Sequence, residues 1–180
     1  MASAKKSART RDYLDPKHIR KITPNRSSLK ISLRKGPKGT SIFATKTIRS
    51  GSVIAYYRMI VKRNATAKTV NKRMYIFTIY TKTGRASSVF VGDVCKECML
   101  PPKNGIPYWA QFSNEPSVKQ DSNAYIDTNL AGNYRNRDRV KEGDFMVYKL
   151  RATKTINPGE EILWCYGDNY GRHYKTSCEA

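Results

Sequence analysis

The sequence predicts one mainly β domain with short helices. Segments rich in β-branched and aromatic residues recur along the chain, and several of them alternate apolar with polar side chains, as strands do. Gly, Pro and Asn separate these segments, which is typical of turns between strands. Residues 106–114, which open with Pro107, instead place bulky apolar residues at near-helical spacing and predict one or two helical turns. A chain of 180 residues suits a single domain with a real core.

Each strand is expected from its own local pattern. The run 52–61 is the strongest, because β-branched and aromatic residues fill it. A bend at Gly36 and Gly39 would let backbone amides approach a ligand, although a plain hairpin turn explains the same residues. A turn containing Gly84 joins two runs that predict a hairpin. In order, we expect strands at 30–35, 42–44, 52–61, 74–80, 87–91, 125–128, 145–152 and 162–164.

The N-terminal 29 residues differ from the rest of the chain. They are basic, rich in Ser and Thr and poor in apolar residues, which predicts a flexible arm over 1–29. Lys5, Lys6, Arg9 and Arg11 fit a nuclear-localisation or DNA-contacting patch, and they fit a solubilising tail equally well. The folded domain is then expected at 30–175, followed by a short tail at 176–180.

The net charge of +20 is concentrated in the first half of the chain. Residues 1–92 contain 22 Lys and Arg against two acidic residues, whereas residues 93–180 contain 12 of each. A basic field of this kind attracts polyanions such as DNA. It also repels a basic peptide, so such a substrate would dock on the acid-bearing half, with Glu115, Asp121 and Asp127 as candidates.

Hydropathy and cysteine content limit the expected setting. No apolar run is long enough to span a bilayer, and no apolar segment follows the basic N-terminus, so neither a membrane role nor a secretory signal is expected. Four cysteines without framework spacing fit a reducing, intracellular compartment. Cys95 and Cys98 have the spacing of half a zinc site, which would need Cys165 and Cys178 or a second chain to complete it. We expect no metal there.

Three separated blocks carry recognisable motifs. The first consists of Gly39, Ile42, Phe43, Ala44, Ile48 and Gly51. The second consists of Phe112, Asn114, Asn123 and Ala124. The third, residues 151–167, contains Gly-Glu-Glu-Ile and ends in Tyr-Gly, followed by a Tyr-Gly-Asp-x-Tyr-Gly pattern over 166–171. Together these blocks resemble the SET-domain family of protein-lysine methyltransferases, and the last pattern is similar to the ending of PR-type SET domains.

The resemblance implies a β-clip-like fold of several small sheets with a C-terminal pseudoknot. Three positions depart from the family pattern: Ser41 stands where the first motif usually has its second Gly, and Gln111 and Glu115 stand where the second motif has Arg and His. The loop within the second motif is also longer. The sequence looks like a compact stand-alone type without the Cys-rich segment that follows many SET domains. A partner, a second copy in a homodimer, or the C-terminal residues themselves would then close the lysine channel.

The resemblance also implies roles for individual residues. The catalytic residues would be Tyr166, which orients the lysine nitrogen, Tyr57, which lines the channel, and Trp164, whose bulk restricts the number of methyl groups. The protein substrate would contact Tyr125, Asp127 and Tyr170. S-adenosylmethionine would be held by Gly39, Thr40, Ser41, Ile42, Phe43, Asn114 and Glu115.

The implied function is transfer of a methyl group from S-adenosylmethionine to a protein lysine, with a histone tail as the expected substrate and the nucleus as the expected location. The basic N-terminal half would contact DNA or the nucleosome. The rival interpretation is a binding module, in which a SET-like fold without turnover serves as a basic DNA- or chromatin-associated adaptor. Calorimetry with S-adenosylmethionine separates the two.

Overall fold

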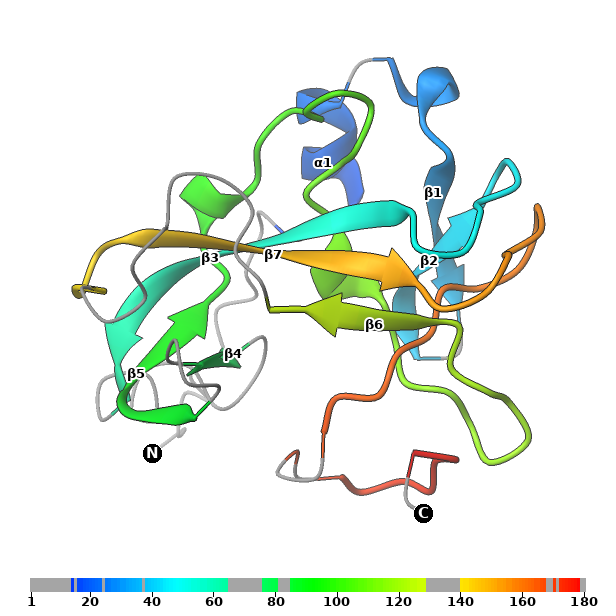
Figure 1. The fold of residues 1–180 in the computed structure, drawn as a ribbon. Coiled ribbons are helices and arrows are strands. Elements are labelled where there is room, and N and C mark those ends of the chain that lie inside the picture. The colour runs from blue at the N-terminus through cyan, green and yellow to red at the C-terminus, as the bar shows by residue number, and fades with distance from the viewer. Residues whose placement is uncertain are drawn as a thin grey trace, which may run out of the picture.

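The computed structural model describes residues 14, 16–23, 25–36, 38–64, 76–80, 85–128, 140–167, 170 and 172–178. Within these residues the chain is mainly β, as the alternating segments predict. The strands form a five-stranded antiparallel sheet and a separate two-stranded hairpin (Figure 1). No helix in this described part is both long and apolar enough to cross a membrane.

The larger sheet has the strand order β4-β5-β3-β7-β6. Strands β3 and β7 lie at its middle, and the hairpin of β4 and β5 extends it at one end (Figure 1). The bounds are β3 Val53–Arg63, β4 Ile76–Tyr80, β5 Ala86–Asp93, β6 Ala124–Asp127 and β7 Phe145–Ala152. The first part of the strand expected at 74–80 lies outside the described residues.

The alternation of side chains along β3 and β7 determines which residues face the core. From Ala55 to Val61, every second residue of β3 is buried, and β7 is buried from Met146 to Ala152 with the same period. Because successive side chains of a strand point to opposite faces, this period places Tyr57 on the core side of the sheet. Tyr57 lies directly opposite the fully buried Tyr148 of β7. Pairing with β7 thus fixes the position of Tyr57 on the core side.

The hairpin of β1 (Ile31–Gly36) and β2 (Gly39–Ala44) lies at the other end of the molecule. Its tight turn requires Gly39 to adopt a φ of 101°, a conformation that residues with a Cβ rarely accept. The side chain of Ile42 is fully buried, which anchors β2 in the core. The bend predicted from the glycines is therefore a hairpin turn.

The N-terminal region differs from the predicted flexible arm. Residues Pro16–Ile22 form helix α1, and Arg26–Ser28 form the 3-10 helix η2. Ile19 is 1% exposed and Leu29 is 2% exposed, so both belong to the core. The prediction was therefore wrong for 16–23 and 25–29, because two well-spaced apolar residues order a segment whose overall composition is polar. Residues 1–13, 15 and 24 of the predicted arm lie outside the described part.

Two further elements are shorter than expected. The helical turns expected at 106–114 reduce to the 3-10 helix η4 (Ala110–Phe112), and another 3-10 helix, η3, covers Lys96–Cys98. The strand expected at 162–164 forms isolated bridges instead. Its residues hydrogen-bond in turn to β2, to 123–124 and to Asn114, so no single neighbour can extend a ladder.

These contacts interlock the C-terminal part with two earlier segments. Leu163 accepts hydrogen bonds at its carbonyl oxygen from the amides of Asn123 and Ala124, while the Trp164 amide donates to the carbonyl oxygen of Asn114 at 3.0 Å. The Ser113 hydroxyl donates to the Ile162 carbonyl oxygen. Residues 162–164 therefore lie between 113–114 and 123–124, and this places all three motif blocks around one region.

Candidate functional site

A cavity of about 720 Å³ lies where the interlocked segments meet β3 and the β1–β2 turn. Its volume is in the range of small-molecule sites in proteins. One side of its wall comes from the turn of the first hairpin and from 110–115. The rest of the wall is largely aromatic, with side chains from Tyr57, Phe77, Trp164, Tyr166, Tyr170 and Tyr174.

Tyr166 is held at both of its ends by the segment 113–115. Its hydroxyl donates a 2.8 Å hydrogen bond to the carbonyl oxygen of Ser113. Its backbone amide donates a 2.6 Å hydrogen bond to the carboxylate of Glu115. The phenol oxygen keeps lone pairs that can accept a hydrogen bond, because a tyrosine hydroxyl donates one bond and accepts others.

The environment keeps Tyr166 protonated. Burial raises the pKa of its hydroxyl far above the ordinary value, and the neighbouring Tyr174, Tyr170, Tyr57 and Glu115 raise it further. A neutral phenol orients a ligand by hydrogen bonding but does not remove a proton from it at neutral pH. Tyr166 can therefore position a reacting group without acting as its base.

An unbroken series of ring contacts forms the aromatic wall. Phe77 stacks on Trp164 with ring centroids 5.7 Å apart and also contacts Tyr57 and Tyr148. Trp164 in turn lies 5.0 Å from Tyr166. Such a wall excludes water and lowers the pKa of an amine that enters it, because desolvation disfavours the charged form.

Glu115 is a buried carboxylate surrounded by donors. It is 1% exposed, and Arg172 binds it through two hydrogen bonds, Nε to Oε2 at 2.9 Å and a terminal guanidinium nitrogen to Oε1 at 2.6 Å. The Tyr174 hydroxyl donates to Oε2 at 2.9 Å. Burial alone would raise the pKa of Glu115, but the hydrogen bonds from Arg172, from the Tyr166 amide and from Tyr174 hold it below its ordinary value. The group is ionised at neutral pH.

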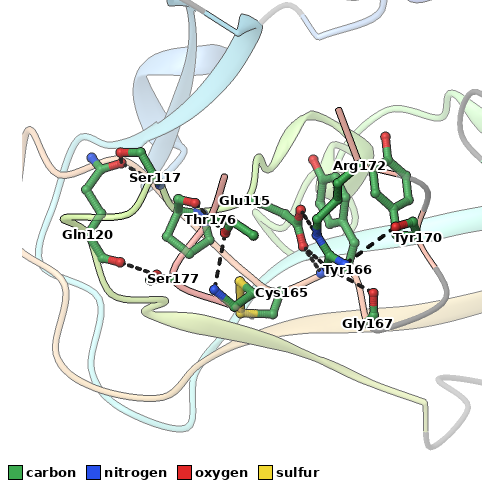
Figure 2. Close-up of a disulfide and its surroundings, with 12 residues drawn as sticks. Glu115, Ser117, Gln120, Cys165, Tyr166, Gly167, Tyr170, Arg172, Thr176 and Ser177 are labelled. Carbon is green, nitrogen blue, oxygen red and sulfur yellow. Dashed lines mark hydrogen bonds and ion pairs between the residues drawn. A yellow bond between two sulfur atoms is a disulfide. The ribbon is translucent and has the colours of Figure 1, made fainter. Parts of the chain in front are cut away.

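Residues 172–178, here called the C-terminal strap, fold back along 115–120. Arg172 and Tyr174 bind Glu115, and the Thr176 hydroxyl donates to the carbonyl oxygen of Pro116 at 2.6 Å. A disulfide between Cys165 and Cys178 closes the end of the strap beside Tyr166 (Figure 2). The C-terminal residues therefore fold back beside the cavity, and Tyr174 contributes to its wall. Closure of a lysine channel by these residues, a partner or a second copy stays a prediction.

Another part of the cavity wall, formed by the hairpin turn and Asn114, consists of backbone and amide groups. Gly39 lines it, and the place where a Cβ would stand at this residue is open. Asn114 also lines it and donates from its amide nitrogen to the Ser41 hydroxyl at 2.7 Å and to Glu161 at 3.2 Å. Ser41 thus orients Asn114 through its side chain.

Two buried polar atoms of wall residues have no hydrogen-bond partner within the described structure: the indole nitrogen of Trp164 and the amide oxygen of Gln111. Buried polar atoms are nearly always satisfied in folded proteins. An unpaired donor and an unpaired acceptor among the residues that line one cavity fit a site that takes a polar ligand.

Comparison with known families identifies the fold. The model of the SET domain matches residues 39–167, which is most of the chain. The chain belongs to the SET domain family. No curated protein matches it in sequence.

Solved SET structures share the fold at low sequence identity. A structure of the ATXR5 SET domain with histone H3 dimethylated on R26 aligns with a TM-score of 0.54 and 16% identity, covering 82% of this chain and 62% of that chain. The complex of ATXR5 with histone H3.1 monomethylated on R26 aligns with a TM-score of 0.52 and 17% identity, covering 84% of this chain and 62% of that chain. KRYPTONITE in complex with mCHH DNA, an H3(1-15) peptide and SAH aligns with a TM-score of 0.50 and 20% identity, covering 78% of this chain and 24% of that chain. The chain thus spans under two thirds of these proteins.

The predicted site residues of this SET domain fall into two groups, those that line the cavity and those that do not. Gly39, Thr40, Tyr57, Asn114, Glu115, Trp164, Tyr166 and Tyr170 all line the cavity. The remaining predicted residues do not. The side chain of Ile42 is fully buried, Phe43 packs beneath Arg34, and Ser41 reaches the wall through Asn114.

The two predicted substrate contacts on β6 also lie away from the cavity wall. Tyr125 is 47% exposed. Asp127 forms an ion pair with Arg151 at 2.8 Å, and Glu115 forms one with Arg172 at 2.6 Å. Two of the three carboxylates expected to attract a basic substrate are therefore already paired within the chain, whereas Asp121 is exposed.

Sequence reasoning missed several residues of this SET domain site, among them Lys38, Phe77, Ser113, Arg172 and Tyr174. Lys38 donates from its ammonium group to the Glu115 carbonyl oxygen at 2.6 Å and lies over the Tyr174 ring. Arg172 and Glu115 are 57 positions apart in the sequence. The available signal was Glu115, a carboxylate at the motif position where the family has His. A carboxylate that is buried at such a position needs a cationic partner.

The cysteines also differ from the expectation of a reduced state. Cys95 pairs with Cys98, and Cys165 pairs with Cys178, with Cα atoms 5.0 and 5.5 Å apart. The sequence spacing of 13 between Cys165 and Cys178 gave no indication that the strap would bring them together. In the described part of the SET domain, no three His, Cys, Asp or Glu residues gather as metal ligands.

Proposed function

We propose that this SET domain transfers a methyl group from S-adenosylmethionine to the side-chain nitrogen of a protein lysine. The observation that carries the proposal is the convergence of Gly39, Asn114 and Tyr166 on one cavity with an aromatic wall. The KRYPTONITE structure, which has the same fold, contains SAH, the product of the cofactor.

The residues at the hairpin end fit the cofactor. Gly39 and Thr40 would contact it through the backbone, because no side chain of Gly39 blocks the approach. Asn114, oriented by Ser41, would contribute its amide. When bound, S-adenosylmethionine supplies a methyl group activated by a positively charged sulfur.

The aromatic end of the cavity would prepare the lysine. Tyr57, Phe77 and Trp164 would surround its side chain and exclude water, which lowers the pKa of the amine and favours the neutral nucleophile. The oxygen of Tyr166 would accept a hydrogen bond from the amine and aim its lone pair, since its own proton is donated to Ser113. Catalysis would then rest on positioning, which contributes strongly to such displacements.

The proposed substrate is a histone tail, and the proposed location of this SET domain is the nucleus. The ATXR5 and KRYPTONITE structures of the same fold contain histone H3 segments. A charge of +20 would place this domain close to DNA, where histone tails are found. Tyr170 at the rim of the cavity, and Tyr125 and Asp127 on β6, are the proposed contacts of the peptide.

Labelled-methyl transfer to core histones tests the proposal. We expect wild-type transfer, and a loss of about 100-fold in Tyr166→Phe, because the amine loses its aligned acceptor. Calorimetry should show S-adenosylmethionine binding within about threefold of wild type in this variant. Tyr56→Phe is the matched control, since Tyr56 packs against Tyr108 on the other face of β3. Neither cofactor binding nor transfer would instead favour the rival interpretation, an inactive DNA- or chromatin-binding adaptor.

A further inference from the structure

The Glu115 carboxylate connects the strap to the centre of the cavity. Oε1 accepts hydrogen bonds from the Tyr166 amide and from Arg172, and Oε2 accepts from Arg172 and from the Tyr174 hydroxyl. The side chains of Glu115 and Arg172 are 0% and 8% exposed. Figure 2 shows Arg172 between Glu115 and the backbone of Gly167, to which it also donates at 2.9 Å.

This arrangement fixes the residue that would face the reacting nitrogen. The amide of Tyr166 depends on Glu115, and its hydroxyl depends on Ser113 two residues earlier. A rigid segment therefore sets both the position of the Tyr166 backbone and the direction of its ring. A shift of about 1 Å at such a residue is enough to lower a rate by about 100-fold.

The Glu115 carboxylate also binds the strap, which contributes Tyr174 to the cavity wall. Tyr170 and Tyr174 line the cavity, and Tyr170 lies 4.8 Å from Tyr166 in an edge-on contact. The strap reaches this position through Arg172 and Tyr174, both bound to Glu115. The backbone of Glu115 also receives Lys38 from the hairpin turn. Three parts of the site thus meet at one residue.

We propose that Glu115 is a positioning residue, which holds Tyr166 and the strap in the arrangement needed for methyl transfer. The inference rests on the proposed function and deepens it. Its carboxylate is occupied by protein donors, so it neither binds the cofactor nor attracts a basic substrate through its charge. Its effect on the reaction passes through Tyr166 and the aromatic rim.

Hydrogen exchange gives a test that does not need activity. In Glu115→Gln, Arg172 faces an amide that cannot accept two parallel bonds. We therefore expect exchange to rise about tenfold or more at the Tyr166 amide and at the Cys178 amide, which reports on the strap because it donates to the Thr176 hydroxyl. Exchange at the Trp164 amide, which donates to Asn114, should stay within about twofold. In Arg172→Gln, the strap should exchange faster while the Tyr166 amide stays protected.

Glu142→Gln is the matched control, because Glu142 forms an exposed ion pair with Arg63 away from the cavity. It should change none of these rates. The proposal is overturned if Glu115→Gln leaves Tyr166 and the strap as protected as in wild type, or if it raises exchange at Trp164 and across β3 and β7 equally, which would indicate general destabilisation.

Kinetics separate positioning from a purely structural role. We expect Glu115→Gln to lower kcat about tenfold per folded molecule, with the KM for S-adenosylmethionine within about threefold of wild type. Unchanged kcat with a raised cofactor KM would contradict the proposal and assign Glu115 to cofactor binding. If the wild-type protein transfers no methyl group, the proposed function fails, and the exchange measurements still decide whether Glu115 holds Tyr166.

Discussion

Trp164 stands where the cavity meets the core. It stacks on Phe77 and contacts Tyr166, so its indole occupies space beside the residue that would orient the amine. A bulky ring at this place leaves less room for an amine that already carries methyl groups. The bulk of this one side chain would therefore set how far methylation proceeds.

Replacing Trp164 by Phe should enlarge the space beside Tyr166 and shift the product towards higher methylation states. Mass spectrometry of histone substrates at equal conversion measures the distribution. We expect wild-type protein to stop mainly at monomethyl-lysine and Trp164→Phe to accumulate dimethyl-lysine. Efficient trimethylation by the wild-type protein would contradict this expectation.

The ion pair of Glu115 also predicts a dependence of stability on pH. Because the folded state lowers the pKa of Glu115, its contribution is fully present above the unfolded value of about 4.3 and is lost as the pH falls through the lower folded value. The difference in unfolding free energy between wild type and Glu115→Gln should therefore be constant from about pH 7 to 5 and shrink by about pH 3.5. Urea unfolding at these pH values tests this, and a constant difference would contradict it.

Among the elements, β3 and β5 approach each other closely at Gly92. A Cβ at this glycine would overlap the sulfur of Met59, which is fully buried on β3. Gly92→Ala should therefore destabilise the protein by about 1–3 kcal/mol through overpacking. Ser88→Ala, an exposed change on the same strand, serves as the control. Thermal unfolding of Gly92→Ala at or above the wild-type midpoint would disprove the overlap.

The elements show what could be predicted from the sequence. Strands such as β3 and β7 were predictable because a period of two along one segment already states which face is buried. Helix α1 was missed, although Pro16 at its first position, followed by Ile19 and Ile22 at a spacing of three, is the pattern of a short amphipathic helix. The polar composition around it concealed these residues.

The site likewise has a part that could be predicted from the sequence and a part that could not. Motif positions such as Gly39, Asn114 and Tyr166 meet as predicted from the ordered blocks. The strap was not predictable, because its contacts join Glu115 to Arg172 and Cys165 to Cys178, and no local pattern records which distant residues will pair. The partner of a buried charge becomes visible only once the chain is folded.

At the scale of the whole molecule, charge dominates the expected behaviour. The first half carries the whole net charge of +20, and two of the three carboxylates expected to attract a basic substrate, Glu115 and Asp127, are ion-paired. A free basic peptide therefore meets little net attraction. DNA would offset the repulsion and bring the tail to the cavity.

We accordingly expect faster methyl transfer on nucleosomes than on free histone peptide, by about tenfold at low salt, with the advantage falling steeply as salt rises. Steady-state rates on both substrates between about 50 and 200 mM salt measure this. Equal rates at all salt concentrations would show that the basic half does not contact nucleosomal DNA.

The interlock of residues 162–164 with 113–114 and 123–124 has a consequence for biosynthesis. Residues 162–164 are synthesised after the two segments that they join, so a nascent chain exposes the apolar surfaces that Ile162, Leu163 and Trp164 later cover. Pairing between such distant residues forms slowly, because a long loop must close first. Until residues 162–164 have been made and have paired, the apolar surfaces that they cover stay exposed, and a chaperone bound there would delay completion of the cavity.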